Sequence, residues 1–129
     1  MSGTYDSFRE NVLKGDRDLD GTVTAHLLTA AYTFDATDDT TGDLTGVAAT
    51  ATVGSKSFTG GRFSSGPVVF TAVTGPNPVV AVAFSVGGNL VAYENDFGAG
   101  PGNTSIPLNG SDIQITPDGT RGWFRLIDA

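Results

Sequence analysis

The chain of 129 residues contains no cysteine and only one histidine. The absence of cysteine excludes disulfide bonds, thiolate metal sites and a cysteine nucleophile, so the fold depends on its hydrophobic core. Basic residues are also scarce. The chain has seven Lys and Arg and fourteen Asp and Glu, which gives a formal net charge of −7. This balance argues against nucleic acid and against an anionic membrane surface as partners.

Long hydrophobic runs are missing as well. The longest, residues 79–84, is far shorter than the roughly twenty residues that a membrane-spanning helix needs. Residues 1–6 hold no basic side chain and no apolar run follows them, which argues against a signal peptide. We therefore expect a protein that is made in, and used from, a cytoplasm.

Gly, Thr and Asp are abundant instead. The eighteen Gly, the seventeen Thr and the ratio of twelve Asp to two Glu favour turns and strands over helices. Short alternating segments between Gly, Pro and Asp turns predict seven to nine strands. We expect an all-β fold, a single-domain antiparallel β-sandwich or barrel of Greek-key or jelly-roll type, with a short N-terminal helix or arm.

The expected strands cover residues 22–27, 47–53, 68–73, 79–86, 90–95, 111–116 and 122–127. Residues 31–34 extend the first strand or start another, and the acidic residues 35–43 predict a solvated loop. Ile113 and Ile115 are expected to point inward.

The clearest hairpin joins residues 79–86 to residues 90–95 through the turn Gly87-Gly88-Asn89. One face of its first strand carries Val80, Val82, Phe84 and Val86. The opposite face carries Ala81, Ala83 and Ser85, which suit close sheet packing or a protein neighbour.

Residues 1–15 form a separate N-terminal arm, and residues 16–129 form the β domain. Apolar residues recur in the arm at helical spacing, at Tyr5, Phe8, Val12 and Leu13. A capping box of Ser7 and Glu10 predicts that the helix starts at residue 7 or 8, and Gly15 predicts its C-cap. So short a helix must dock, either on its own domain, which we favour, or on a neighbouring subunit.

Asp16, Asp18 and Asp20, followed by Gly21, match the first half of a calcium-binding loop. Position 12 of that loop is Leu27, where a bidentate Glu normally closes the site. We therefore favour an acidic turn over a metal site.

Other candidate sites are weak. His26 lies in a predicted strand without a motif around it, Glu94 and Asp96 are paired acids at a strand end, and residues 54–57 lack the first glycine of a phosphate loop. We expect no catalytic, metal or cofactor site, and hence a protein that is not an enzyme.

Two sequons, at Asn103 and Asn109, matter only in a secretory pathway, and Asn109-Gly110 is better interpreted as a turn. Arg62, Arg121 and Arg125 are either surface charges or partners for acids of a neighbouring copy.

The order of these segments resembles small structural proteins of tailed bacteriophages. The similarity rests on Gly15-Asp16-Arg17-Asp18-Leu19-Asp20, Thr22-Val23, Leu27-Leu28, Tyr32, Phe34, Leu90-Val91-Ala92-Tyr93, Asp96-Phe97, Ile113 to Gly119, Phe124 and Leu126. The insertion Thr120-Arg121-Gly122-Trp123 and the acidic loop depart from the pattern.

The resemblance implies a non-enzymatic virion protein, assembled in the host bacterial cytoplasm, that decorates the capsid as a cement protein. Its implied partners are the major capsid protein and copies of itself, as a trimer or another homo-oligomer. Partner contacts are expected in the arm, at Tyr5, Phe8, Arg9 and Val12. The alternatives are a tail or head–tail connector protein and a host- or carbohydrate-binding module displayed on the particle.

Overall fold

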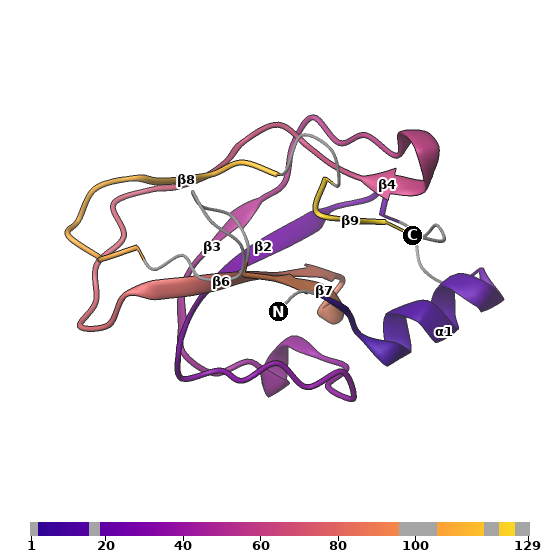
Figure 1. Cartoon of the computed structure of the whole chain (residues 1–129), viewed down its shortest axis with the longest axis horizontal. Helices are drawn as coiled ribbons and strands as arrows, with labels where there is room; N and C mark the ends of the chain where they lie inside the picture. The colour runs from indigo at the N-terminus through magenta and orange to yellow at the C-terminus, as the bar shows by residue number, and fades with distance from the viewer. Residues whose placement is uncertain (1–2, 16–18, 96–105, 118–121, 126–129) are drawn as a thin grey trace.

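The computed structural model describes residues 3–15, 19–95, 106–117 and 122–125, and one α-helix and nine strands lie within them (Figure 1). In chain order they are β1 (Gly3–Thr4), α1 (Asp6–Lys14), β2 (Val23–Thr29), β3 (Val47–Thr52), β4 (Arg62–Phe63), β5 (Val68–Phe70), β6 (Val79–Val86), β7 (Asn89–Glu94), β8 (Ile113–Ile115) and β9 (Phe124–Arg125). Short 3₁₀ turns cover Thr41–Asp43 and Thr59–Gly61.

The strands form one large antiparallel sheet and two small ones. The large sheet has the order β1-β7-β6-β2-β3, and β4 pairs with β9 and β5 with β8. The two small sheets lie above the large one in Figure 1. The fold is thus mostly β and sandwich-like, as the sequence predicts, and the strands of the described residues do not close into a barrel.

A first hydrophobic core fills the space between the large sheet and the small sheets. From the large sheet it takes alternate residues of β2, namely Val23, Ala25 and Leu27, and from β8 it takes Ile113 and Ile115. The predicted inward orientation of both isoleucines is therefore confirmed. Further members include Phe70 and the aromatic residues Phe8, Phe63, Phe84 and Trp123. The rings of these four meet Phe124 or one another.

A second core covers the opposite face of the large sheet. The long connection between β2 and β3 runs below the sheet in Figure 1 and packs Tyr32 and Leu44 against it. The remaining members of this core are Tyr5, Leu28, Ala81, Ala83, Leu90 and Tyr93, with Phe34 and Val80 at its margin. The small face of β6 is thus covered by the chain's own connection. Asp35 and Asp43, at the two ends of the acidic segment 35–43 within that connection, are exposed, as expected of a solvated loop.

The predicted hairpin is confirmed, but the predicted face of β6 is wrong at one position. Gly87 and Gly88 form the two-residue turn with φ of 57° and 83°, which favours glycine. Val80 packs with the second core and not with Val82, because Leu28 pairs with Ala81 and Thr29 with Val79. This leaves Val80 as the extra residue of a β-bulge, which reverses the alternation of side chains.

The expected strand at residues 31–34 is also wrong. After β2 the chain turns at residues 30–31, and residues 32–35 make no strand pairing. Tyr32 and Phe34 instead supply rings to the second core, where Phe34 lies 5.1 Å from both Tyr5 and Tyr93, measured between ring centroids. Residues 31–34 are therefore held by aromatic packing and not by the strand pairing that the sequence suggested.

The N-terminal helix begins one residue before the expected range. Its N-cap is Tyr5, which makes no side-chain cap, so the capping box of Ser7 and Glu10 does not form. The hydroxyl of Ser7 is buried without a hydrogen-bond partner in the described part of the chain. The C-cap is Gly15 with φ of 76°, as predicted.

Candidate functional site

The N-terminal arm wraps around the β7 side of the large sheet. β1 pairs with β7, the Tyr5 amide donates to the Val91 carbonyl at 3.0 Å, and α1 follows at once. Tyr5 enters the second core and Phe8 enters the first, and both side chains are 0% exposed. The arm therefore holds both faces of the sheet at this edge.

A hydrogen-bonded chain links the arm to the connection below the sheet. The Tyr32 hydroxyl donates to the Asp38 carboxylate at 2.8 Å, and the hydroxyls of Tyr5 and Tyr32 lie 2.9 Å apart. Because Tyr32 has one proton to donate, Tyr5 is the donor between them. Burial raises the pKa of Tyr5 far above its usual value and that of Tyr32 to about 12, so both stay neutral at physiological pH.

Arg9 closes the outer edge of β1. Its guanidinium donates to the carbonyl and to the hydroxyl of Thr4, each at 2.6 Å, and it forms an ion pair with Asp6. The two-residue strand β1 is thereby occupied on one side by β7 and on the other by a side chain.

The four predicted contact residues of the arm thus differ in accessibility. Tyr5 and Phe8 are used by the chain's own core, which leaves them no surface for a partner while the arm is docked. Val12 is partly buried against the first core, and Arg9 is exposed. Leu13, at 88% exposure, is the most exposed large hydrophobic side chain of the described residues.

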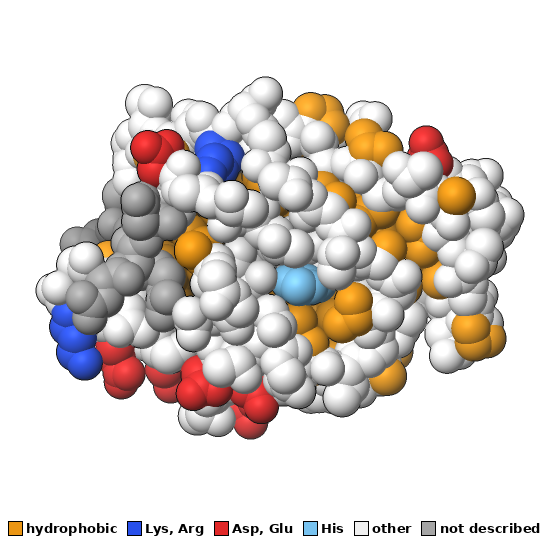
Figure 2. Space-filling view, turned by 180° about the vertical axis from the view of Figure 1, so that it is seen from behind, with side chains coloured by type: hydrophobic (Ala, Val, Ile, Leu, Met, Phe, Trp, Pro, Cys, Tyr) orange, Lys and Arg blue, Asp and Glu red, His pale blue; other side chains and the backbone are white. Residues whose placement is uncertain are grey.

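The opposite edge of the large sheet is β3. Within the described residues no strand pairs with its outer side. Residues 44–55, which contain β3, include no charged side chain, although the chain has a net charge of −7. Figure 2 views the molecule from behind and shows His26, drawn in pale blue, in a broad area without red or blue side chains, which lie toward the margins.

The ladder between β2 and β3 fixes which backbone groups face outward. The Val53 amide donates to the Val23 carbonyl at 2.9 Å, and Ala51 is the partner of Ala25 two residues further along. Hydrogen-bonded and non-hydrogen-bonded pairs alternate in an antiparallel ladder. The backbone N–H and C=O groups of Thr50 and Thr52 therefore point away from β2, toward the open edge.

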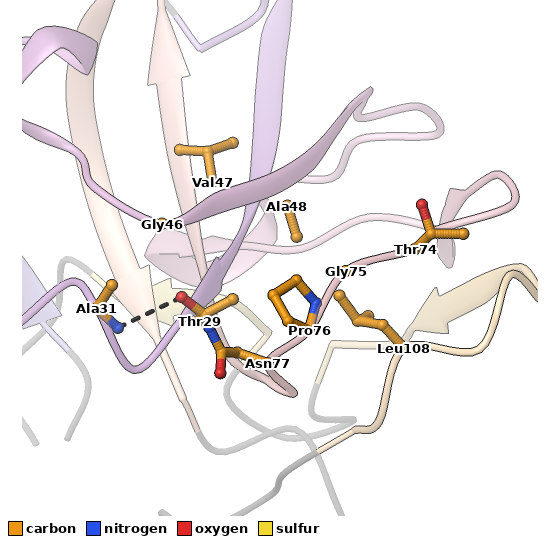
Figure 3. Close-up of a pocket in the computed structure, with 10 residues that line it drawn as sticks. All are labelled: Thr29, Ala31, Gly46, Val47, Ala48, Thr74, Gly75, Pro76, Asn77 and Leu108. Atoms are coloured by element: carbon orange, nitrogen blue, oxygen red, sulfur yellow. Dashed lines mark hydrogen bonds between the residues drawn. The ribbon is translucent and has the colours of Figure 1, made fainter.

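A hollow lies beside the first residues of β3 (Figure 3). Its volume is about 300 Å³. The described residues that line it are uncharged and come from the end of β2, the β2–β3 connection, the start of β3, residues 74–77 and Leu108. Val47 is 42% exposed, and the one hydrogen bond drawn there joins the Ala31 amide to the Thr29 hydroxyl at 3.3 Å. Among the described residues that line the hollow, none has an acidic or basic side chain.

His26 lies next to this edge, opposite Thr50 in the ladder. Its Nε2 is 2.8 Å from the hydroxyl of Ser85, and both side chains are buried. Burial lowers the pKa of His26 below its usual 6.5, so the ring is neutral near pH 7. Within the described residues no cluster of three His, Asp or Glu able to hold a metal ion surrounds it.

The remaining candidate residues are dispersed. Glu94 is buried in β7, Asp20 is exposed, and Lys56 donates to the carbonyls of Leu19 and Gly21, at 2.9 Å to the first. Arg62 and Arg125 are opposite each other in the β4–β9 ladder. Five further candidates lie outside the described residues, namely Asp16, Asp18, Asp96, Asn103 and Arg121. The calcium-loop and paired-acid hypotheses therefore stay predictions.

Asn109 forms a turn, as predicted. Its side-chain oxygen accepts from the Ser111 amide at 3.1 Å, and Gly110 has φ of 84°. The edge at β3 and its hollow were missed by the sequence reasoning, and their signal was the uncharged run at residues 44–55.

Comparisons with protein family models, with curated proteins and with solved structures gave no match. Among the described residues, no helix has the length and apolar character needed to cross a lipid bilayer.

Proposed function

We propose that this chain is a non-enzymatic structural protein of a tailed bacteriophage particle. In this role it binds the outer surface of the major capsid protein shell as a decoration protein and stabilises the shell. The resemblance of the sequence to small phage structural proteins supports this assignment, and the two features below support it further.

The proposal rests mainly on where the residues that resemble the phage pattern lie in the structure. Leu28, Tyr32 and Phe34 from the first half of the pattern pack with Leu90 and Tyr93 from the second half, in the core below the large sheet. Segments about 60 residues apart thus meet in one cluster. The residues that carry the resemblance are thus part of the core, where a pattern that reflects the fold is expected to lie.

The surfaces of the protein suit binding to other proteins. The N-terminal arm exposes Arg9 and Leu13 to solvent. At the other side of the large sheet, the edge at β3 carries no charged side chain. Interfaces between proteins are depleted of charged residues at their centres and surrounded by polar rims. The net negative charge favours solubility before assembly.

Quantitative mass spectrometry of gradient-purified particles, from cells that carry the gene, tests the proposal. We expect a copy number comparable with that of the major capsid protein. A copy number far below it would move the protein to the tail or the connector, and absence from the particles would refute a virion role.

A sedimentation assay with undecorated shells then tests the arm as the contact. Leu13→Asp should weaken binding to the shells by at least about tenfold, corresponding to about 1.4 kcal/mol. Val69→Asp is the matched control, since Val69 is 46% exposed in β5. Equal binding by the two variants would refute the arm as the docking surface.

A further inference from the structure

We propose that two copies of this chain associate through their β3 edges, with β3 of one copy antiparallel to β3 of the other. The resulting sheet is continuous and has ten strands, five from each copy. This dimer is a property of the isolated chain, so its test is independent of the test for a virion role.

The first argument is that the β3 edge has backbone N–H and C=O groups that no strand of the described residues pairs with. Thr50 and Thr52 direct backbone donors and acceptors outward, and no strand of the described residues pairs there. Natural proteins usually protect such an edge with charged side chains, proline or a very short strand. β3 has six residues and contains no charged residue and no proline. A bulge is another such protection, but the bulge of β3, at Ala48, leaves Thr50 and Thr52 in regular pairing with β2.

The second argument is charge, and it selects a second copy as the partner. Two chains that each have a net charge of −7 repel one another, and like charges brought together at an interface cost several kcal/mol. Residues 44–55 are uncharged, so the edge is a place where two copies can meet without placing carboxylates opposite each other.

The third argument is register. Since Thr50 and Thr52 carry the outward backbone groups, Thr50 of one copy pairs with Thr52 of the other, and Ala51 lies on the two-fold axis. This register avoids Ala48, which is the extra residue of a bulge between the partners of Leu27 and Leu28. It forms two Thr–Thr cross-strand pairs, which are favourable, and its small side chains allow close approach.

The side chains of Thr50 and Thr52 are exposed, so they can be replaced without disturbing the core. The test compares the native chain with Thr50→Lys/Thr52→Lys and Thr50→Glu/Thr52→Glu double variants. The matched control is Gln114→Lys, at an exposed position in the middle of β8. Molar mass is measured by sedimentation equilibrium over a range of concentrations, and circular dichroism verifies folding.

We expect a dimer for the native chain and for Gln114→Lys. Each double variant alone should be monomeric, with its dimer dissociation constant raised at least about a hundredfold, because four like charges meet at the edge. An equimolar mixture of the Lys and Glu variants should restore the dimer. This restoration excludes misfolding of the variants as the reason for their monomeric state.

Hydrogen exchange supplies a second readout. Amides of Thr50 and Thr52 should exchange more slowly as the native protein becomes more concentrated, since pairing occupies them. A native chain that stays monomeric throughout, or an association that survives both double variants, would overturn the proposal. So would a mixture of the Lys and Glu variants that stays monomeric.

Discussion

The large sheet ends in two different ways. At β1 the edge is two residues long, is followed directly by a helix and has the Thr4 carbonyl bonded to Arg9. At β3 the edge is six residues long, uncharged and open along its outer side within the described residues. The chain thus protects one edge with its own N-terminal arm and leaves the other unpaired within the described residues. Four changes test or extend this contrast, in decreasing order of expected effect.

Phe8→Ala should release the arm from the closed edge. Phe8 is fully buried, and its ring meets Phe124 edge-on with centroids 5.6 Å apart. Loss of a buried phenylalanine lowers the free energy of unfolding by about 3–5 kcal/mol. Urea denaturation measures this value. Leu13→Ala, at an exposed position of the same helix, is the control and should stay within about 0.5 kcal/mol of the native chain. A loss below that limit for Phe8→Ala would contradict a docked arm.

Gly46→Ala should distort the start of the open edge. Gly46 has φ of 66°, and a methyl group there would lie 2.8 Å from the side chain of Ala31. Backbone strain and crowding together predict a loss of about 2–3 kcal/mol in unfolding free energy. Gly42→Ala is the control, because a methyl group at Gly42 meets nothing closer than 3.6 Å. Thermal unfolding of both variants checks the prediction, and equal losses would contradict it.

His26, next to the open β3 edge, should make the free energy of unfolding depend on pH. Burial holds the pKa of His26 below 6.5, so the unfolded chain takes up its proton at a higher pH than the folded chain. The contribution of His26 to stability is therefore largest well above pH 6.5 and falls as the pH drops below that value, by at most about 1.4 kcal/mol per pH unit. The pKa values of Asp35 and Asp43 are lowered from 3.8, so their contributions are lost only at more acidic pH. His26→Gln should remove this dependence on pH just below 6.5, and an unchanged slope would show another origin.

Arg9→Ala should open the β1 edge with the smallest effect on stability. The ion pair of Arg9 with Asp6 is about half exposed, and pairs of this kind contribute less than about 1 kcal/mol. Removing the guanidinium frees the Thr4 carbonyl, so the amides of β1 should exchange faster with solvent. Glu10→Ala, at an exposed position of the same helix, should not change this exchange. Equal exchange in both variants would show that Arg9 does not hold the edge.

The sequence predicted what short-range patterns determine. Alternation located β2, β6 and β8, and the glycines at residues 87 and 88 located the hairpin turn, because these features depend on neighbours within a few residues. Val80 was misplaced because a bulge depends on how β6 pairs with β2, which alternation alone does not encode.

The candidate surfaces were harder to predict for the same reason. Helical spacing identified Phe8 as apolar, but burial in its own core and burial against a partner require the same spacing. Which strand becomes the open edge follows from pairing between distant segments, so β3 could not be distinguished from β2 in advance. The aromatic residues Tyr32 and Phe34 suggested a strand, and only the tertiary packing shows that their segment covers a sheet face.

The pairing of β1 with β7 also sets an order of events during synthesis. Gly3 pairs with Tyr93, 90 residues later in the chain, so the arm has no docking site until β7 has been made. Ribosomes add about 5–20 residues per second, so this delay lasts on the order of 5–20 s. During that interval Tyr5 and Phe8 are exposed on the nascent chain. We therefore expect chaperones to bind the arm before β1 pairs with β7 and covers that edge of the sheet.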